Sequence, residues 1–152
     1  MEIRLALAEL GLTLPVASLP LAAYVPAVKT GNLVFTAGQL PLVDGKMPYV
    51  GKVDGGVTPE QAKAMAQVCI LNALAAVNLV ADVDDIKRIV RVVGYVNGVP
   101  GFTGMPGVVN GASELLIKLW GEVDGKHART AIGVADLPLD APVEIELTVE
   151  LK

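Results

Sequence analysis

Residues 143–151, with the sequence VEIELTVEL, alternate between apolar and polar side chains without exception. Successive side chains of a β-strand point to opposite faces of the sheet, so the odd-numbered residues would share one face and the even-numbered residues the other. The pattern therefore predicts a strand whose apolar face lies in a core. Its other face carries Glu144, Glu146, Thr148 and Glu150.

The clearest helical signal lies further back, at Thr58-Pro59-Glu60-Gln61. Thr58 can cap a helix, Pro59 suits its first position, and Gln61 completes a capping box. Small apolar residues then recur every three or four positions to about residue 80, which predicts a helix that lies close against a sheet. Residues 112–120 predict a second helix.

The other apolar segments complete the order of elements. Further strands are predicted at residues 32–37, 47–53, 86–96 and 129–134. Asp44-Gly45 marks a hairpin turn, and the Gly- and Pro-rich residues 97–107 predict a loop. The order ββαβαββ predicts an α+β fold in which two helices cover one face of a sheet. With 152 residues, we expect a single domain over residues 1–152, in which residues 1–20 form an N-terminal helix (2–10) and part of an extended arm.

Composition narrows the classes of function. The chain is 53% hydrophobic and 18% charged with a mean hydropathy of +0.55, which excludes intrinsic disorder and predicts an oligomer that buries apolar surface. A net charge of −4 and an aromatic content of 4% argue against nucleic-acid binding. Pro15, Pro20 and Pro26 interrupt the apolar N-terminal stretch, so we expect no membrane span. With one cysteine, the chain is expected to be cytoplasmic.

Four residues are candidates for chemistry, and each has a plainer interpretation. His127, the only histidine, is interpreted as an exposed bystander in a polar loop, and Cys69 as a core residue. Arg129 begins an apolar strand; it either pairs with a surface carboxylate, which composition favours, or grips a substrate carboxylate with its two-pronged guanidinium. Glu144 lies either on a solvated face or in an oligomer interface, where a raised pKa would suit acid–base chemistry.

Two blocks of sequence resemble a known family. Residues 24–28 (YVPAV) and 31–41 (GNLVFTAGQLP) resemble the N-terminal signature of the Rid family, the reactive intermediate deaminases formerly called YjgF. Residues 128–138 (ARTAIGVADLP) and 143–146 (VEIE) resemble its C-terminal signature. Both blocks occur in order with two expected helices between them, so the resemblance covers nearly all of the chain.

The resemblance implies a chorismate-mutase-like fold assembled as a homotrimer with a central β-barrel and with pockets in the clefts between subunits. It implies hydrolysis of small 2-imino acids to 2-keto acids and ammonia, without a metal or organic cofactor. Arg129 would hold the substrate carboxylate and Glu144 would handle the attacking water. The positions that line the cleft in the family fall on Tyr24, Gly38, Asn110 and Ala131.

Departures from the family pattern identify a divergent branch. Ala131 stands where deaminase members often have cysteine, and Lys126-His127-Ala128 replaces a Phe-Pro-Ala sequence. Three other functions therefore stay open: a non-catalytic trimer that binds small carboxylates, an endoribonuclease or translation inhibitor, and a chorismate mutase. Charge and aromatic content argue against the second, and one pocket arginine is too few to hold the dicarboxylate of the third.

Overall fold

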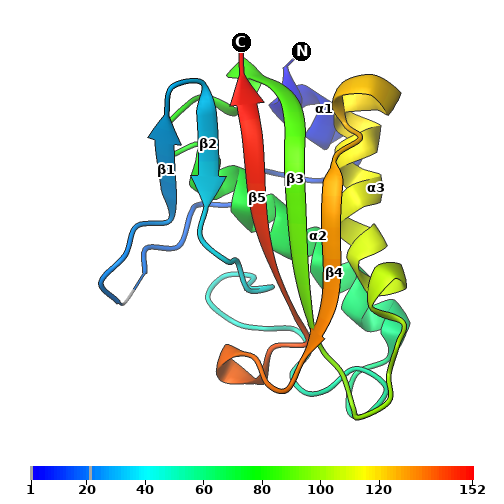
Figure 1. Ribbon diagram of the computed structural model, residues 1–152. Coiled ribbons are helices and arrows are strands. Elements are labelled where there is room, and N and C mark those ends of the chain that lie inside the picture. The colour runs from blue at the N-terminus through cyan, green and yellow to red at the C-terminus, as the bar shows by residue number, and fades with distance from the viewer. Residues whose placement is uncertain (1, 21) are drawn as a thin grey trace.

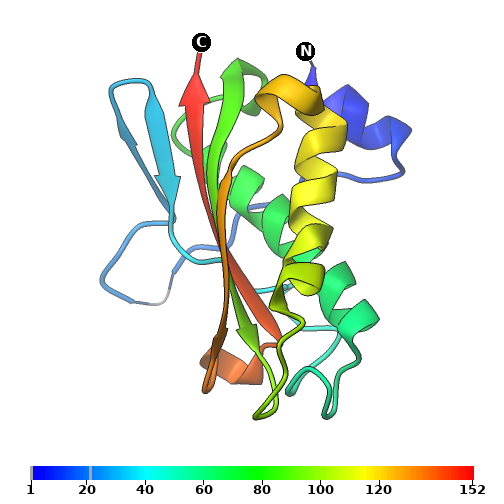
Figure 2. The same cartoon turned by 45° about the vertical axis from the view of Figure 1, so that its right-hand side comes forward.

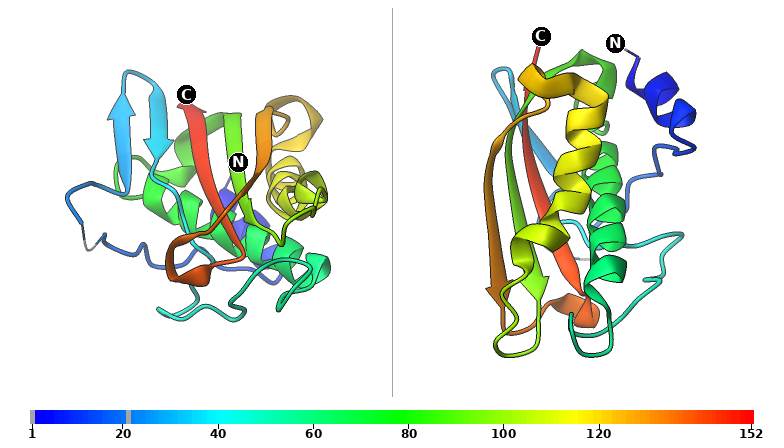
Figure 3. Two further views of the ribbon diagram at one scale, coloured as in Figure 1. Left: turned by 60° about the horizontal axis from the view of Figure 1, so that its bottom comes forward. Right: turned by 90° about the vertical axis from the view of Figure 1, so that its right-hand side faces the viewer.

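The computed structural model describes residues 2–20 and 22–152, and within them one mixed sheet is covered on one face by two long helices (Figures 1 and 3). The sheet order is β1-β2-β5-β3-β4; only the β3–β4 pair is parallel. The elements are α1 (Ile3–Glu9), β1 (Ala27–Thr30), β2 (Leu33–Thr36), α2 (Pro59–Val77), β3 (Ile86–Asn97), α3 (Met105–Asp124), β4 (Ala128–Val134) and β5 (Val143–Leu151), with short 3-10 helices η1 (Val83–Asp85) and η2 (Pro138–Asp140).

The alternating segment forms β5, the central strand, as predicted. Its odd-numbered side chains are buried and its even-numbered side chains are half-buried. Val149 pairs with Val34 on β2, and Leu147 pairs with Val92 on β3, all of them buried. Viewed edge-on, α2 and α3 lie on one side of the sheet and leave the other side uncovered (Figure 3, right). We call these the helix face and the open face.

The N-terminal signal of α2 is confirmed in detail. The Thr58 Oγ1 accepts a hydrogen bond from the Gln61 N–H at 3.1 Å, and the Gln61 Oε1 accepts one from the Thr58 N–H at 3.0 Å. The small residues that follow bring α3 close to α2. A Cβ at Gly111 of α3 would come within 2.9 Å of the carbonyl carbon of Lys63 on α2, so that only glycine fits there.

The order ββαβαββ is confirmed, and the predicted strand at 32–37 forms β2. It is the second strand of the order, because β1, which was not predicted, precedes it. The predicted strand at 47–53 is wrong, because Pro41 and Pro48 flank the turn and lack the N–H groups that a ladder needs. The Asp44-Gly45 turn itself forms, with Val43 and Lys46 exchanging backbone hydrogen bonds of 2.7 and 3.0 Å. The true hairpin joins β1 to β2, and β2 in turn pairs with β5; Figure 2 shows this hairpin at the β5 side of the sheet.

Helix α3 is longer than the predicted 112–120. It begins at Met105, so the last residues of the predicted loop at 97–107 are helical. Pro106 suits a first turn, Val108 and Val109 are buried, and Val109 packs against Gly94 of β3. The start was missed because Gly107 and Gly111 have low helix propensity. Within the described ranges, no helix is both long and apolar enough to cross a membrane.

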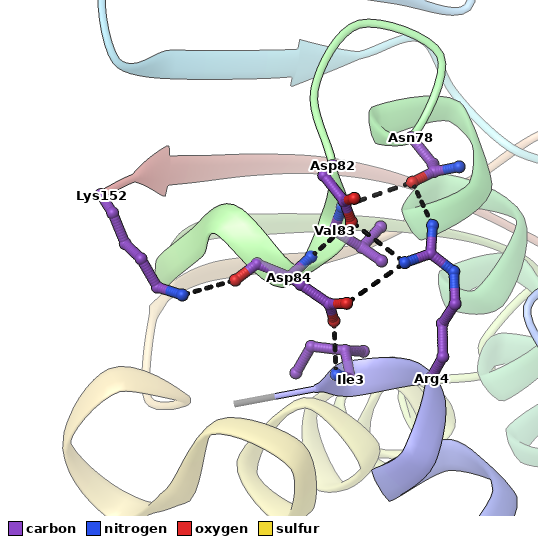
Figure 4. A network of polar contacts seen from close by, with 7 residues as sticks. All are labelled: Ile3, Arg4, Asn78, Asp82, Val83, Asp84 and Lys152. Atoms are coloured by element: carbon purple, nitrogen blue, oxygen red, sulfur yellow. Dashed lines mark hydrogen bonds and ion pairs between the residues drawn. The ribbon is translucent and has the colours of Figure 1, made fainter.

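Helix α1 forms as predicted, and hydrogen bonds join it to the end of α2 and to η1 (Figure 4). Ile3 and Leu7 are buried in the same cluster of apolar side chains as the strands. The Arg4 guanidinium donates to Asp82 Oδ1 at 3.0 Å and to Asp84 Oδ2 at 3.2 Å. The Ile3 N–H donates to Asp84 Oδ1 at 2.6 Å. These contacts join the N-terminal segment to the core.

Candidate active site

Arg129 lies on β4, at an edge of the sheet, and its side chain is held by α3. In the register of the sheet it pairs with Val92, which is buried under the helices, so Arg129 is on the helix face. Its Nη1 donates to Asn110 Oδ1 at 2.7 Å and to Ser113 Oγ at 3.3 Å. Its Nη2 lies 3.5 Å from the Pro106 carbonyl oxygen. All these acceptors are neutral.

The positive charge of Arg129 has no carboxylate partner within residues 2–20 and 22–152, where the ion pairs involve other side chains. The interpretation of Arg129 as half of a surface ion pair is therefore wrong. A guanidinium has five N–H donors. Nη1 uses both of its hydrogens on Asn110 and Ser113, which leaves the Nε–H and an Nη2–H for a ligand. Those two parallel donors match the two oxygens of a carboxylate.

His127 is not the exposed bystander that the sequence suggested. The chain turns back after α3, so that the imidazole is half-buried, with Nδ1 2.7 Å from the Gly125 carbonyl oxygen and Nε2 2.9 Å from Ser113 Oγ. Burial lowers the pKa of His127; the Gly125 carbonyl opposes this shift and the charge of Arg129 adds to it. Ser113 links the two side chains. No motif in the sequence singled out Ser113, because Asn110, three residues before it, lay outside the predicted helix.

Glu144 lies on the open face, where it pairs with Tyr95 across β5 and β3. Burial raises the pKa of Glu144, and the neighbouring Glu146 raises it further. Gly38 lies against this carboxylate: a Cβ there would come within 2.9 Å of Glu144 Cδ, and closer still to Oε1. The absence of a side chain at residue 38 therefore makes room for the Glu144 carboxylate. The structure thus brings Gly38 and Glu144 together.

The other predicted residues divide between the two faces. Asn110 contacts Arg129 directly, and Ala131 pairs with the buried Gly94 on the helix face. Tyr24 lies before β1 and is 57% exposed. Cys69 is fully buried, as predicted, and burial raises the pKa of its thiol well above the usual value. Nowhere in the described part of the chain do three or more His, Cys, Asp or Glu side chains gather as metal ligands would.

Two groups of polar residues therefore lie on opposite faces of one sheet. The first group, Asn110, Ser113, His127 and Arg129, offers a fixed cation on the helix face. The second, Gly38 and Glu144, offers a carboxylate with a raised pKa on the open face. Because the sheet separates them, one chain alone does not direct both groups at one small ligand.

Comparison with known proteins identifies the family of the chain. The model of the family described as Endoribonuclease L-PSP matches residues 15–151, which leaves α1 outside the match. Protein TCP17 of Trypanosoma cruzi is 38% identical over 146 residues, which cover 95% of this chain and 91% of that protein. The crystal structure of Atu1372 from Agrobacterium tumefaciens has 43% identity and a TM-score of 0.90, covering 99% of this chain and 92% of that one. Escherichia coli YjgF has 26% identity and a TM-score of 0.62, covering 90% and 94%. The chain therefore belongs to the endoribonuclease L-PSP family, the YjgF/Rid superfamily that the two sequence blocks predicted.

Proposed function

We propose that the protein hydrolyses small 2-imino acids to 2-keto acids and ammonia, in sites that two chains of a homotrimer complete together. The observation that carries this proposal is the state of Arg129. Its guanidinium is oriented by Asn110 and Ser113, yet no carboxylate of the described chain neutralises it. An oriented cation with two donors to spare fits the carboxylate of an imino acid.

The position of Glu144 supports a site shared between chains. It lies on the opposite side of the sheet from Arg129, so a second copy would supply the carboxylate that a site around Arg129 needs. The open face of the sheet, on which Glu144 lies, also carries large apolar side chains that are exposed to solvent in the single chain. Val28, Phe35 and Ile132 are 52%, 43% and 42% exposed, and an assembly of sheets that bury this face would cover them.

The chemistry follows from the two groups. Arg129 would fix the substrate carboxylate and so orient the adjacent C=N carbon toward water. Glu144 would accept a proton from that water as its oxygen bonds to the carbon, and would deliver the proton to the nitrogen. In the resulting tetrahedral carbinolamine, Glu144 would transfer the hydroxyl proton to the nitrogen as the C–N bond breaks, which releases ammonia and leaves the 2-keto acid. A raised pKa suits Glu144 to both proton transfers near neutral pH.

The same Arg129 site would also serve a trimer that only binds small carboxylates. Keto-acid release from 2-iminopropanoate and 2-iminobutanoate, generated in situ by an amino-acid-deaminating enzyme, separates the two functions. A deaminase accelerates release, and Arg129→Ala and Glu144→Ala both abolish the acceleration. A binder shows no acceleration, yet Arg129→Ala removes carboxylate binding. RNA cleavage that survives Arg129→Ala would favour an endoribonuclease instead.

Light scattering tests the assembly. The trimer predicts a mass about three times that of the 15.8 kDa chain. A monomer at assay concentration would contradict the shared site, because Arg129 and Glu144 would then have no common cleft. Mixing the inactive Arg129→Ala and Glu144→Ala variants adds a direct test: if two chains share each site, mixed trimers regain part of the activity.

A further inference from the structure

A chain of hydrogen bonds runs from the proposed carboxylate site into the protein. Ser113 Oγ lies 3.3 Å from Arg129 Nη1 and 2.9 Å from His127 Nε2, and the far side of the imidazole reaches the Gly125 carbonyl oxygen at 2.7 Å. Ser113 is 8% exposed, so its hydroxyl depends on these protein partners. The two side chains that it joins both follow α3 in sequence and return to the same point on that helix.

The direction of each bond follows from the chemistry of its ends. The Gly125 carbonyl can only accept, so Nδ1 of the imidazole carries a hydrogen. In the neutral imidazole Nε2 is then an acceptor, which takes the hydroxyl hydrogen of Ser113. The oxygen of that hydroxyl keeps its lone pairs for Arg129. Each donor thus meets an acceptor, in the order Arg129, Ser113, His127, Gly125.

Protonation of the imidazole reverses one bond in this chain. Nε2 then donates to Ser113 Oγ, so two cationic donors converge on one oxygen and the hydroxyl hydrogen must turn away. While Arg129 is unpaired, its charge opposes this state. A ligand carboxylate on Arg129 would offset that charge and make protonation of His127 easier.

We propose that Ser113 and His127 are positioning residues for Arg129, and that a carboxylate bound at Arg129 promotes protonation of His127 through Ser113. This inference rests on the proposed carboxylate site and adds to it a proton linkage and two residues outside direct contact with the ligand. Linkage is reciprocal, so protonation of His127 must strengthen carboxylate binding by the same factor.

Other charged side chains near His127 affect its protonation equilibrium in the absence of a ligand. Arg88 from β3, Glu150 from β5 and Lys126 line a shallow cavity of about 510 Å³ together with the imidazole. Lys126 is also paired with Glu122 of α3 at 2.6 Å. None of these side chains forms a hydrogen bond with Ser113 in the described structure, whereas Arg129 does. The ligand-dependent change should therefore require Arg129 and Ser113, and should survive loss of Arg88.

The chain has one histidine, so untagged protein gives one imidazole signal in an NMR titration. We expect saturating pyruvate, a stable 2-keto carboxylate, to shift the midpoint of this titration upward. Even in a water-like dielectric, a unit charge about 6 Å away changes a protonation equilibrium by about threefold. Pyruvate should accordingly bind about threefold more tightly below the midpoint than above it.

Variants test whether the coupling passes through Ser113. Ser113→Ala should remove the coupling and raise KM more than it lowers kcat, and Ser113→Thr should restore the coupling and the KM. Arg88→Gln should retain the coupling.

The outcomes separate the two proposals. Binding of pyruvate, seen in backbone amide shifts, with an unchanged histidine midpoint would overturn the positioning role while the carboxylate site stands. A shift that persists in Ser113→Ala would also overturn it. Failure of pyruvate to bind at all, or binding that survives Arg129→Gln, would overturn the carboxylate site and this inference with it.

Discussion

Replacing Gly38 by alanine should remove most of the activity while leaving the fold nearly as stable. The new Cβ would lie 2.9 Å from Glu144 Cδ and closer still to Oε1. Because non-bonded carbon atoms prefer about 3.5–4.0 Å, the carboxylate must move by about 1 Å. Gly38 has no positive φ, and the end of a glutamate side chain is flexible. The free energy of unfolding should thus change by less than about 1 kcal/mol.

The catalytic effect of that movement should be much larger. Misplacement of a reacting group by about 1 Å can cost about 100-fold in rate, which is the loss in kcat/KM expected for keto-acid release. Gly107→Ala is the matched control, because a Cβ there meets nothing within 4 Å. Full activity in a folded Gly38→Ala variant would refute the assignment of Glu144 to the reaction. Unfolding of that variant would refute the packing argument instead.

Three further predictions concern stability, each measured by urea unfolding. Gly107→Ala should stabilise the protein by up to about 1 kcal/mol through helix propensity, whereas Gly111→Ala should destabilise it by about 1–3 kcal/mol because its Cβ overlaps the backbone of Lys63; equal effects would contradict the α2–α3 packing. Glu144→Gln should raise stability at pH 7. A carboxyl whose pKa is raised in the folded state destabilises the fold progressively as pH rises above its ordinary, unfolded-state pKa, and fully above the raised pKa. The gain should therefore vanish in acid below both values, and a gain that persists there would count against the shift. Leu7→Ala should cost about 2–5 kcal/mol, since Leu7 is fully buried, and a negligible cost would show that α1 is not part of the core.

Local signals in the sequence predicted much of the fold. The alternation in residues 143–151 and the capping box at Thr58 concern neighbours in sequence, whose geometry is set by the backbone alone. The errors arose where a local signal was outweighed by a tertiary contact or by another local feature. A close approach to Lys63 keeps Gly111 in a helix that its propensity disfavours. Prolines on both sides of the Asp44-Gly45 turn prevent the strands that the turn alone would suggest.

The candidate site was predictable only in part. Resemblance pointed to Arg129 and Asn110, and the structure places them 2.7 Å apart. Ser113 was missed because Asn110 lay outside the predicted second helix, which began at residue 112. In the longer α3, residues 110 and 113 are three positions apart and so share a face, which turns both side chains toward β4. The burial of His127 depends on how the chain turns after α3, which no short pattern encodes.

The group around Arg129 and the group around Glu144 each place a charge where a purely structural role would not. Stability alone would pair Arg129 with a carboxylate and leave Glu144 in water, yet Arg129 meets only neutral acceptors in the described chain and Glu144 is half-buried beside Glu146. In the described chain neither charged group is paired with an opposite charge, and each would be neutralised by an opposite charge or a proton brought from outside. A carboxylate ligand would bring a negative charge to Arg129, and a water molecule that gives up a proton would bring that proton to Glu144. The unpaired charges of the described chain therefore match, in sign and in place, the charges that a 2-imino acid and water would supply.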